Sequence, residues 1–206
     1  MLLASLTPWQ IFGPILVVVG LIALWELFRM SRAGFPLIVE AFVVVLGLAG
    51  LWWLRVLENV VGKPEGLWVP LVLIPVLPTW TADIVAYLVG STVGSRKIAP
   101  RLSPGKTWEG TIAGFVAAGM IAYGIARVDY AWYAPIIALL VGPVALGGDL
   151  LESWIKRRAS VKDSGTLFPG HGGMLDRIDS LVAVSILTFV LQAPGCCLTG
   201  SGMMAR

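Results

Sequence analysis

The sequence predicts an all-α protein that crosses a membrane several times, and three observations support this. Apolar residues make up 57% of the 206-residue chain and charged residues only 13%, about half the charged share of a soluble domain. The apolar residues are collected in long runs, and a helix needs about 20 of them to cross a bilayer. The ten-residue alternation of a membrane β-barrel is absent. Because backbone polar groups in lipid must be satisfied within their own segment, we expect helices.

Six apolar runs are long enough to span the membrane, and we expect a single integral membrane domain over residues 1–206. The runs cover approximately residues 11–28, 36–54, 67–89, 110–127, 131–149 and 178–194. The third run contains Pro70, Pro75 and Pro78, and proline removes a helix hydrogen bond. We therefore expect this third helix to be kinked or broken, in which case there are seven helical pieces.

Lysine and arginine gather in the loops after the first, third and fifth runs. These are Arg29 and Arg32; Arg96, Lys97, Arg101 and Lys106; and Lys156, Arg157, Arg158, Lys162 and Arg177. The opposite loops and the C-terminus hold only Arg55, Lys63, Arg127 and Arg206. The positive-inside rule then predicts a multi-pass protein of the cell (inner) membrane, with its polar loops in the cytoplasm and both termini outside. Cations confined to a few loops do not predict a nucleic-acid partner.

Residues 153–179 are the most polar stretch of the chain. They contain cations, aspartates, the only histidine and four glycines, although apolar runs flank them on both sides. Such a segment cannot lie in hydrocarbon. A charged, glycine-rich loop at a membrane surface suits an enzyme that meets a soluble phosphorylated substrate there.

Three aspartates are the candidate metal ligands. Asp149 lies at the end of the fifth run, and its helical face also carries Glu152 and Ser153. Asp176 and Asp179 are three residues apart at the start of the sixth run, so both point the same way on a helix. Carboxylates that converge repel unless a cation lies between them, and oxygen ligands at a phosphate site favour Mg²⁺. The alternative is that Asp176 and Asp179 only cap their helix.

Other acidic residues also lie within or beside apolar runs, where a charge requires a reason. Asp83 follows the proline-rich half of the third run. It either bonds across the helix bundle or lines a polar cavity, and the sequence leaves both open. Glu26 and Glu40 lie near the ends of their runs, and we expect them near an interface, solvated or locally paired.

The loop over residues 94–110 carries four cations and opens a helix, which suits an anion. Its Gly105-Lys106-Thr107 resembles the end of a P-loop, but that motif requires glycine where Pro100 stands. We reject a P-loop and expect a phosphate cradle, with contact to anionic lipid as the alternative. In residues 164–173, glycines allow backbone N–H groups to approach an anion. His171 either donates to phosphate, carries a proton, or only shapes the turn.

Two blocks of residues resemble the phosphatidate cytidylyltransferase family. The first combines Ser153, Lys156-Arg157, Lys162-Asp163, Gly165, His171-Gly172-Gly173, Asp176-Arg177 and Asp179. The second combines residues 82–87 with residues 101–110, from Arg101 to Gly110. Together they identify residues 80–190 as the catalytic part, while the first 75 residues read as generic membrane helix.

The resemblance implies a reaction in which CTP and phosphatidate give CDP-diacylglycerol and pyrophosphate, with Mg²⁺ as cofactor. It places the metal on Asp149, Asp176 and Asp179, and Asp149, Ser153, Lys156, Arg157, Lys162, Asp163, His171 and Arg177 among the catalytic residues. Asp83, Arg101, Ser103, Lys106, Lys156, Arg157, Lys162 and Arg177 would bind substrate. Whether Asp83 contacts metal or cytosine, and whether a second cation takes part, stay open. So does the choice between a monomer and a homodimer.

Two rival functions fit parts of the same pattern. A CTP-dependent lipid kinase, or a nucleotidyltransferase for another lipid phosphate, would need similar basic loops, and product analysis would separate them. A membrane transporter would also use intramembrane acids and a proline-broken helix. Its charges would lie near the midplane, however, whereas here they gather at one surface.

Overall fold

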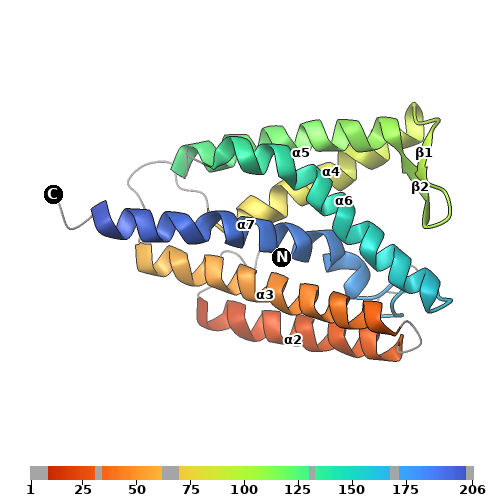
Figure 1. The fold of residues 1–206 in the computed structure, drawn as a ribbon, viewed down its shortest axis with the longest axis horizontal. Coiled ribbons are helices and arrows are strands. Elements are labelled where there is room, and N and C mark those ends of the chain that lie inside the picture. The colour runs from red at the N-terminus through yellow and green to blue at the C-terminus, as the bar shows by residue number, and fades with distance from the viewer. Residues whose placement is uncertain (1–8, 31–33, 62–69, 130–132, 168–171, 203–206) are drawn as a thin grey trace.

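The computed structural model describes residues 9–30, 34–61, 70–129, 133–167 and 172–202 (Figure 1). Within them the chain forms six helices and one small antiparallel sheet, labelled here as in Figure 1. The helices are α2 (Trp9–Arg29), α3 (Phe35–Val61), α4 (Leu73–Thr92), α5 (Trp108–Asp129), α6 (Ala134–Arg158) and α7 (Leu175–Gly202). The strands are β1 (Lys97–Ala99) and β2 (Ser103–Thr107). The all-α prediction is confirmed, and the hairpin is the part that it lacked.

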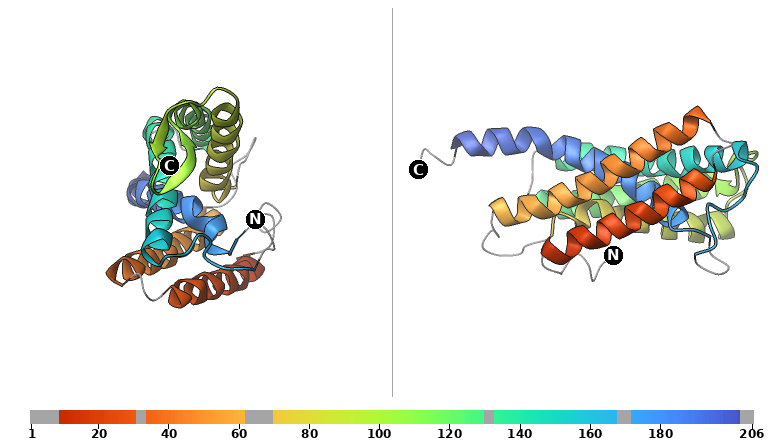
Figure 2. Two further views of the ribbon diagram at one scale, coloured as in Figure 1. Left: turned by 90° about the vertical axis from the view of Figure 1, so that its right-hand side faces the viewer. Right: turned by 90° about the horizontal axis from the view of Figure 1, so that it is seen from below.

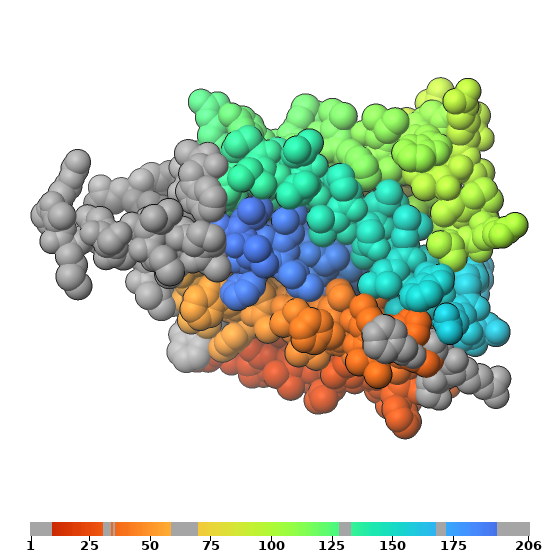
Figure 3. Space-filling view, viewed as in Figure 1, coloured from red at the N-terminus to blue at the C-terminus, as the bar shows by residue number. Residues whose placement is uncertain are grey.

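The helices lie side by side as an elongated bundle (Figures 1 and 2). α7 packs between α3 and α6, which the space-filling view shows on one face (Figure 3). α2 lies against α3 on one side of α7, and α4 lies against α5 on the other. Large apolar side chains such as Leu21, Phe28 and Leu139 are exposed on the outside, as expected where lipid replaces water.

Five of the helices in the described part of the chain are long and apolar enough to cross a membrane. These are Gln10–Arg29, Pro36–Glu58, Leu73–Thr92, Trp108–Arg127 and Ala134–Arg158. The chain is therefore a multi-pass membrane protein. α2, α4 and α6 end, and α3, α5 and α7 begin, at the same end of the bundle (Figure 1, right). The loops that the sequence groups by charge are thus also grouped in space.

Two predicted features of the helices differ from the structure. α4 is one continuous helix that begins at Leu73, so the predicted break does not occur. Pro70 precedes this helix and Pro75 lies in its first turn, where proline is tolerated, and only Pro78 is internal. α6 continues nine residues beyond the predicted end of its span. Lys156, Arg157 and Arg158 therefore stand on a helix instead of in a loop.

Small residues bring neighbouring helices together at two places that matter for the site. A Cβ atom at Gly110 would lie 2.8 Å from the Cα of Gly90, so α5 and α4 approach closely there. A Cβ atom at Gly148 would lie 2.7 Å from the carbonyl oxygen of Asp179, so α6 and α7 also touch. Without a hydrophobic drive between helices in lipid, such close packing supplies much of their attraction. The second contact brings Asp149 beside the start of α7.

Candidate active site

Carboxylates from three helices meet at the polar end of the bundle. Asp149 and Glu152 belong to α6, Asp179 belongs to α7, and Asp83 belongs to α4. The charge of Asp179 repels those of Asp149, Glu152 and Asp83. The predicted convergence of Asp149 and Asp179 is therefore present. It is accompanied by Asp83, for which the cavity interpretation is favoured because its side chain lines the pocket described below.

Lys156 joins the two helices that carry most of these acids. Its Nζ lies 2.6 Å from Oδ1 of Asp176 on α7 and 3.4 Å from Oε2 of Glu152 on its own helix. Glu152 is completely buried. Within the described part of the chain, neither of its carboxylate oxygens has a hydrogen-bond partner. The lysine therefore places a positive charge beside a fully buried carboxyl group.

Lys106 reaches the same group of acids from the hairpin. β1 and β2 pair antiparallel, with Lys97 opposite Thr107 and Ala99 opposite Ser103. This register directs Lys106 toward α6, where its ammonium forms an ion pair with Oδ2 of Asp149. Oδ1 of Asp149 accepts a hydrogen bond of 3.3 Å from the hydroxyl of Ser153. Asp149 thus contacts Ser153 on its own helical face and Lys106 on the hairpin.

The base of the hairpin is fixed by the first turn of α5. The carboxylate of Glu109 accepts hydrogen bonds from the hydroxyl of Ser95 at 2.8 Å and from its backbone N–H at 3.2 Å. The hydroxyl of Thr107 accepts the backbone N–H of Gly110 at 3.3 Å, which is the bond of a helix N-cap. The loop expected to form a phosphate cradle is therefore an ordered hairpin that ends in a capped helix.

The glycine-rich segment folds around carboxylates of the protein itself. Oδ2 of Asp176 accepts the N–H groups of Ser164 at 3.0 Å and Gly173 at 2.7 Å, and the hydroxyl of Ser164 at 2.9 Å. Gly172 has a φ of +84°, a left-handed conformation that favours glycine. The sequence interpretation assigned such N–H groups to a phosphate. In the structure these donors already serve Asp176.

Asp176 consequently combines a capping contact with an ion pair. It stands in the first turn of α7, before the apolar part of that helix. Burial acts to raise the pKa of Asp176, but the hydrogen bond from Lys156, the N–H of Gly173 and the charge of Lys156 outweigh it and lower this pKa to about 2. The carboxylate is therefore ionised at neutral pH and bridges the glycine segment to Lys156.

Glu26 and Glu40 were expected to be solvated or locally paired, and this part of the expectation is wrong. Each side chain is 1% exposed. Glu26 of α2 accepts the backbone N–H groups of Met174 at 3.0 Å and Leu175 at 2.9 Å. Glu40 of α3 interacts electrostatically with Asp179 and Lys156. No sequence pattern predicts these contacts, because more than a hundred residues separate each glutamate from its partners.

The predicted residues thus divide into three groups. Those brought together are Asp83, Lys106, Asp149, Ser153, Lys156, Asp176 and Asp179. Arg157 is exposed and turns toward the hairpin, where its Nε donates to the carbonyl oxygen of Leu102 at 3.4 Å. Other predicted residues lie at or near the surface, namely Arg101, Ser103, Lys162, Asp163 and Arg177. His171 lies outside the described residues.

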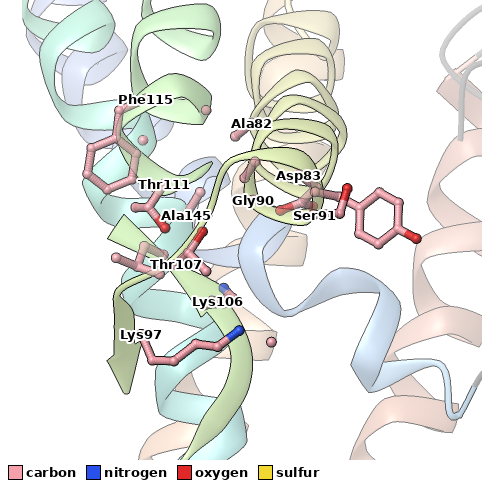
Figure 4. Close-up of a pocket in the computed structure, with 17 residues that line it drawn as sticks. Ala82, Asp83, Gly90, Ser91, Lys97, Lys106, Thr107, Thr111, Phe115 and Ala145 are labelled. Carbon is pink, nitrogen blue, oxygen red and sulfur yellow. The ribbon is translucent and has the colours of Figure 1, made fainter. Parts of the chain in front are cut away.

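A cavity of about 510 Å³ opens beside the acidic group, between α4, α5, α6 and the hairpin (Figure 4). Its polar wall includes Asp83, Lys97 and Lys106, and its apolar wall includes Phe115 and Leu146. This volume lies within the range of small-molecule sites. The two walls differ in character, so the cavity can accept a ligand with a charged part and an apolar part.

The carboxylates have the chemistry of a magnesium site but are not arranged as one. Among the described residues, no group of three or more His, Cys, Asp and Glu side chains is assembled to hold a metal ion. The reason is visible, because Lys106 and Lys156 take the places between the acids. The buried oxygens of Glu152 lack hydrogen-bond donors in the part of the chain that is described. Hard oxygen donors without partners suit a divalent cation, so the residues fit the ion if the lysines move.

Fold and site together define a multi-pass membrane protein with acids and lysines gathered at one membrane surface. A model of the Cytidylyltransferase family matches residues 1–193. A phosphatidate cytidylyltransferase of Rickettsia bellii is 31% identical over 189 residues, covering 86% of this chain and 78% of that protein. The chain therefore belongs to the cytidylyltransferase family, as its motifs indicate.

Two other relatives are more similar over shorter stretches. A phosphatidate cytidylyltransferase of Brucella abortus is 47% identical over 117 residues, covering 55% of this chain and 43% of that protein. One of Haemophilus influenzae is 44% identical over 145 residues, covering 66% and 49%. The chain thus spans about half the length of these two relatives or less.

Proposed function

We propose that this protein transfers a cytidylyl group from CTP to phosphatidate, giving CDP-diacylglycerol and pyrophosphate in phospholipid synthesis. One observation supports this proposal more strongly than the others. Two lysines from separate segments, Lys106 and Lys156, are ion-paired with aspartates of two different helices at the polar end of the bundle. The names of the relatives support the same substrates, CTP and phosphatidate.

The reaction requires no nucleophile from the protein. A phosphate oxygen of phosphatidate attacks the α-phosphorus of CTP, so a new P–O bond forms. The bond from the α-phosphorus to the oxygen bridging the β-phosphate breaks, and pyrophosphate leaves with that electron pair. Both substrates are anions, so catalysis consists mainly of holding them together and neutralising charge.

The lysines have the main binding role in this proposal. The ammonium groups of Lys106 and Lys156 would exchange their carboxylate partners for phosphate oxygens when substrate enters. Arg157, Lys162, Arg177 and Arg101 would add charge around the triphosphate from the surface. Asp163 and His171 would act beside them in the same loop, and Ser153 would keep Asp149 oriented through the contact that they share.

The same exchange frees carboxylates for magnesium. Asp149, Asp176 and Asp179 would hold the ion, and Glu152 adds buried oxygen atoms at the same place. When bound, Mg²⁺ would supply positive charge that offsets the repulsion between the two phosphates. Ser164 and Gly173 keep Asp176 in position for this role through their hydrogen bonds.

The cavity suits a substrate that stays in the membrane. Its charged wall with Lys97 and Lys106 would face the phosphates of the nucleotide or the lipid head, and its apolar wall would face the acyl chains. We place this end in the cytoplasm, because the loops with the most lysine and arginine lie there. CTP would then arrive from water while the lipid tails remain in the bilayer.

The test is an assay of purified protein in phosphatidate-containing vesicles with labelled CTP, with and without Mg²⁺. We expect labelled CDP-lipid on thin-layer analysis, formed only with magnesium and only from phosphatidate. Labelled product from another lipid phosphate would indicate a related nucleotidyltransferase. Transfer of the terminal phosphate would indicate a lipid kinase, and solute flux without turnover would indicate a transporter. Any of these three outcomes would overturn the proposal.

A further inference from the structure

We propose that Glu26, in the first described helix, is a positioning residue for the active site, acting through the start of α7. This inference rests on the proposed function for its effect on turnover, but its structural part does not. Glu26 touches none of the reacting groups. It holds the segment that presents Asp176, which we call the glycine segment and define as residues 164–167 and 172–175.

Among the described residues, the hydrogen bonds of Glu26 go to the glycine segment. Oε1 accepts the N–H of Met174 at 3.0 Å, and Oε2 accepts the N–H of Leu175 at 2.9 Å. These donors stand at the start of α7, whose first N–H groups have no partner within the helix. The Glu26 carboxylate therefore caps the N-terminal end of α7, although Glu26 belongs to a different helix. Its negative charge also lies at the positive end of the α7 dipole.

Ser164 connects this cap directly to Asp176. Its hydroxyl oxygen lies 3.1 Å from Oε2 of Glu26 and 2.9 Å from Oδ2 of Asp176. A hydroxyl has only one proton to donate, so the two carboxylates share it. A change at Glu26 consequently alters how Ser164 serves Asp176. Through Asp176 it reaches Lys156, whose Nζ is 2.6 Å away.

Two glycines of the segment are explained by the same carboxylate. A Cβ atom at Gly165 would lie 2.8 Å from Cδ of Glu26, which is closer than real contacts allow. A Cβ atom at Gly173 would collide with both oxygens of Glu26 and with the hydroxyl of Ser164. The backbone can thus wrap around Glu26 only because these positions lack side chains. The glycines and Glu26 form one arrangement, although they are far apart in sequence.

Replacement by the isosteric amide tests this arrangement with little change in volume. In Glu26→Gln only one end of the side chain can accept, so one of the N–H groups of Met174 and Leu175 faces an NH₂ group instead. We expect kcat to fall about 10- to 100-fold, as for supporting residues of other sites. The KM values for CTP and phosphatidate should change less than about threefold, because the binding lysines remain. A role in folding alone would instead lower the amount of folded protein and leave kcat of the folded fraction unchanged.

A second readout needs no activity. Lys162 is exposed just before the glycine segment, and trypsin cleavage after it can be followed by mass spectrometry. Release of the segment in Glu26→Gln should accelerate this cleavage. Arg29→Gln is the matched control, since Arg29 lies one turn further along α2 with an exposed side chain. The control should retain the kcat and the cleavage rate of the unsubstituted protein.

The outcomes separate this inference from the proposed function. Unchanged kcat and unchanged cleavage in Glu26→Gln would overturn the positioning role. If the unsubstituted protein makes no CDP-lipid, the proposed function fails, yet the cleavage comparison still decides whether Glu26 holds the segment. If the glutamine variant does not fold, Glu26→Asp replaces it, because aspartate keeps the charge but withdraws it by one methylene. Wild-type cleavage and kcat in that variant would equally overturn the inference.

Discussion

The glycine segment and the β1–β2 hairpin both bring a charged group to the same acidic site, but they are held very differently. Around the glycine segment, Asp176 and Glu26 accept four backbone N–H groups at 2.7–3.0 Å and share the hydroxyl of Ser164. The hairpin is mostly exposed. Its contacts with α6 include the ion pair of Lys106 with Asp149 and the hydrogen bond from Arg157 of α6 to the carbonyl oxygen of Leu102. The glycine segment is therefore held by a dense set of hydrogen bonds, whereas the exposed part of the hairpin is held by fewer contacts.

This difference suits the two regions to two different roles within one site. A carboxylate that binds a metal ion must be in place beforehand, and hydrogen bonds from a second layer of residues achieve that. A lysine that binds a phosphate must release one partner and accept another. Lys156, whose side chain is 13% exposed, pairs with the aspartate that the glycine segment holds, and Lys106, at 25%, stands on the hairpin. Substitutions at these positions should therefore differ in kind.

The largest effect is expected from Lys156→Met. Methionine fills most of the space but leaves Glu152 and Asp176 without their cation. Breaking a buried pair in this way costs about 3–5 kcal/mol of stability, and activity should be lost with it. Thermal unfolding in detergent measures the change, with Lys106→Met as the control, which should lower the unfolding temperature much less. Equal losses in the two variants would break the distinction between the regions.

The next largest effect is expected from Asp149→Asn, which lies between the two regions. The amide keeps the shape and the contact to Ser153 but removes the negative charge that pairs with Lys106. We expect kcat to fall roughly 10²–10³-fold, as when other preorganised charge stabilisation is removed, with little change in the unfolding temperature. Magnesium should raise that temperature in the unsubstituted protein but not in the variant. Full activity in Asp149→Asn would remove this residue from the metal site.

The smallest effect is expected from Lys106→Ala. Its ion pair is partly solvated, and such pairs contribute about 0–1 kcal/mol to stability. We expect the KM for CTP to rise about tenfold, the typical loss for one charged contact worth about 1.4 kcal/mol, with a smaller change for phosphatidate. Initial rates at varied concentrations of each substrate measure both values. A larger change for phosphatidate would place the hairpin at the lipid head instead.

Much of the fold was predictable because lipid imposes a length rule on each helix. Five of the six predicted spans correspond to described helices long and apolar enough to cross a membrane, while the sixth run lies in α7, which is not among them. Residues 153–179 were recognisable as the most polar stretch. The hairpin was not, since Pro100, Pro104 and Gly105 are typical of irregular loops and its pairing depends on Glu109 fixing its base. Glu152 was detectable from its spacing to Asp149 on the same helical face. Nothing in sequence connects Glu26 to Leu175, because that contact depends on how α2 lies beside α7.

The contact of Gly148 with Asp179 links the packing of α6 against α7 to the arrangement of the acidic site. Residue 148 is followed at once by Asp149, and residue 179 is itself one of the acids, so the gap between α6 and α7 is also the gap between two carboxylates. A methyl group at position 148 would push α6 and α7 apart and would separate the two carboxylates as well. The absence of a side chain at position 148 therefore sets the distance between the two carboxylates, across which a single ion could be shared.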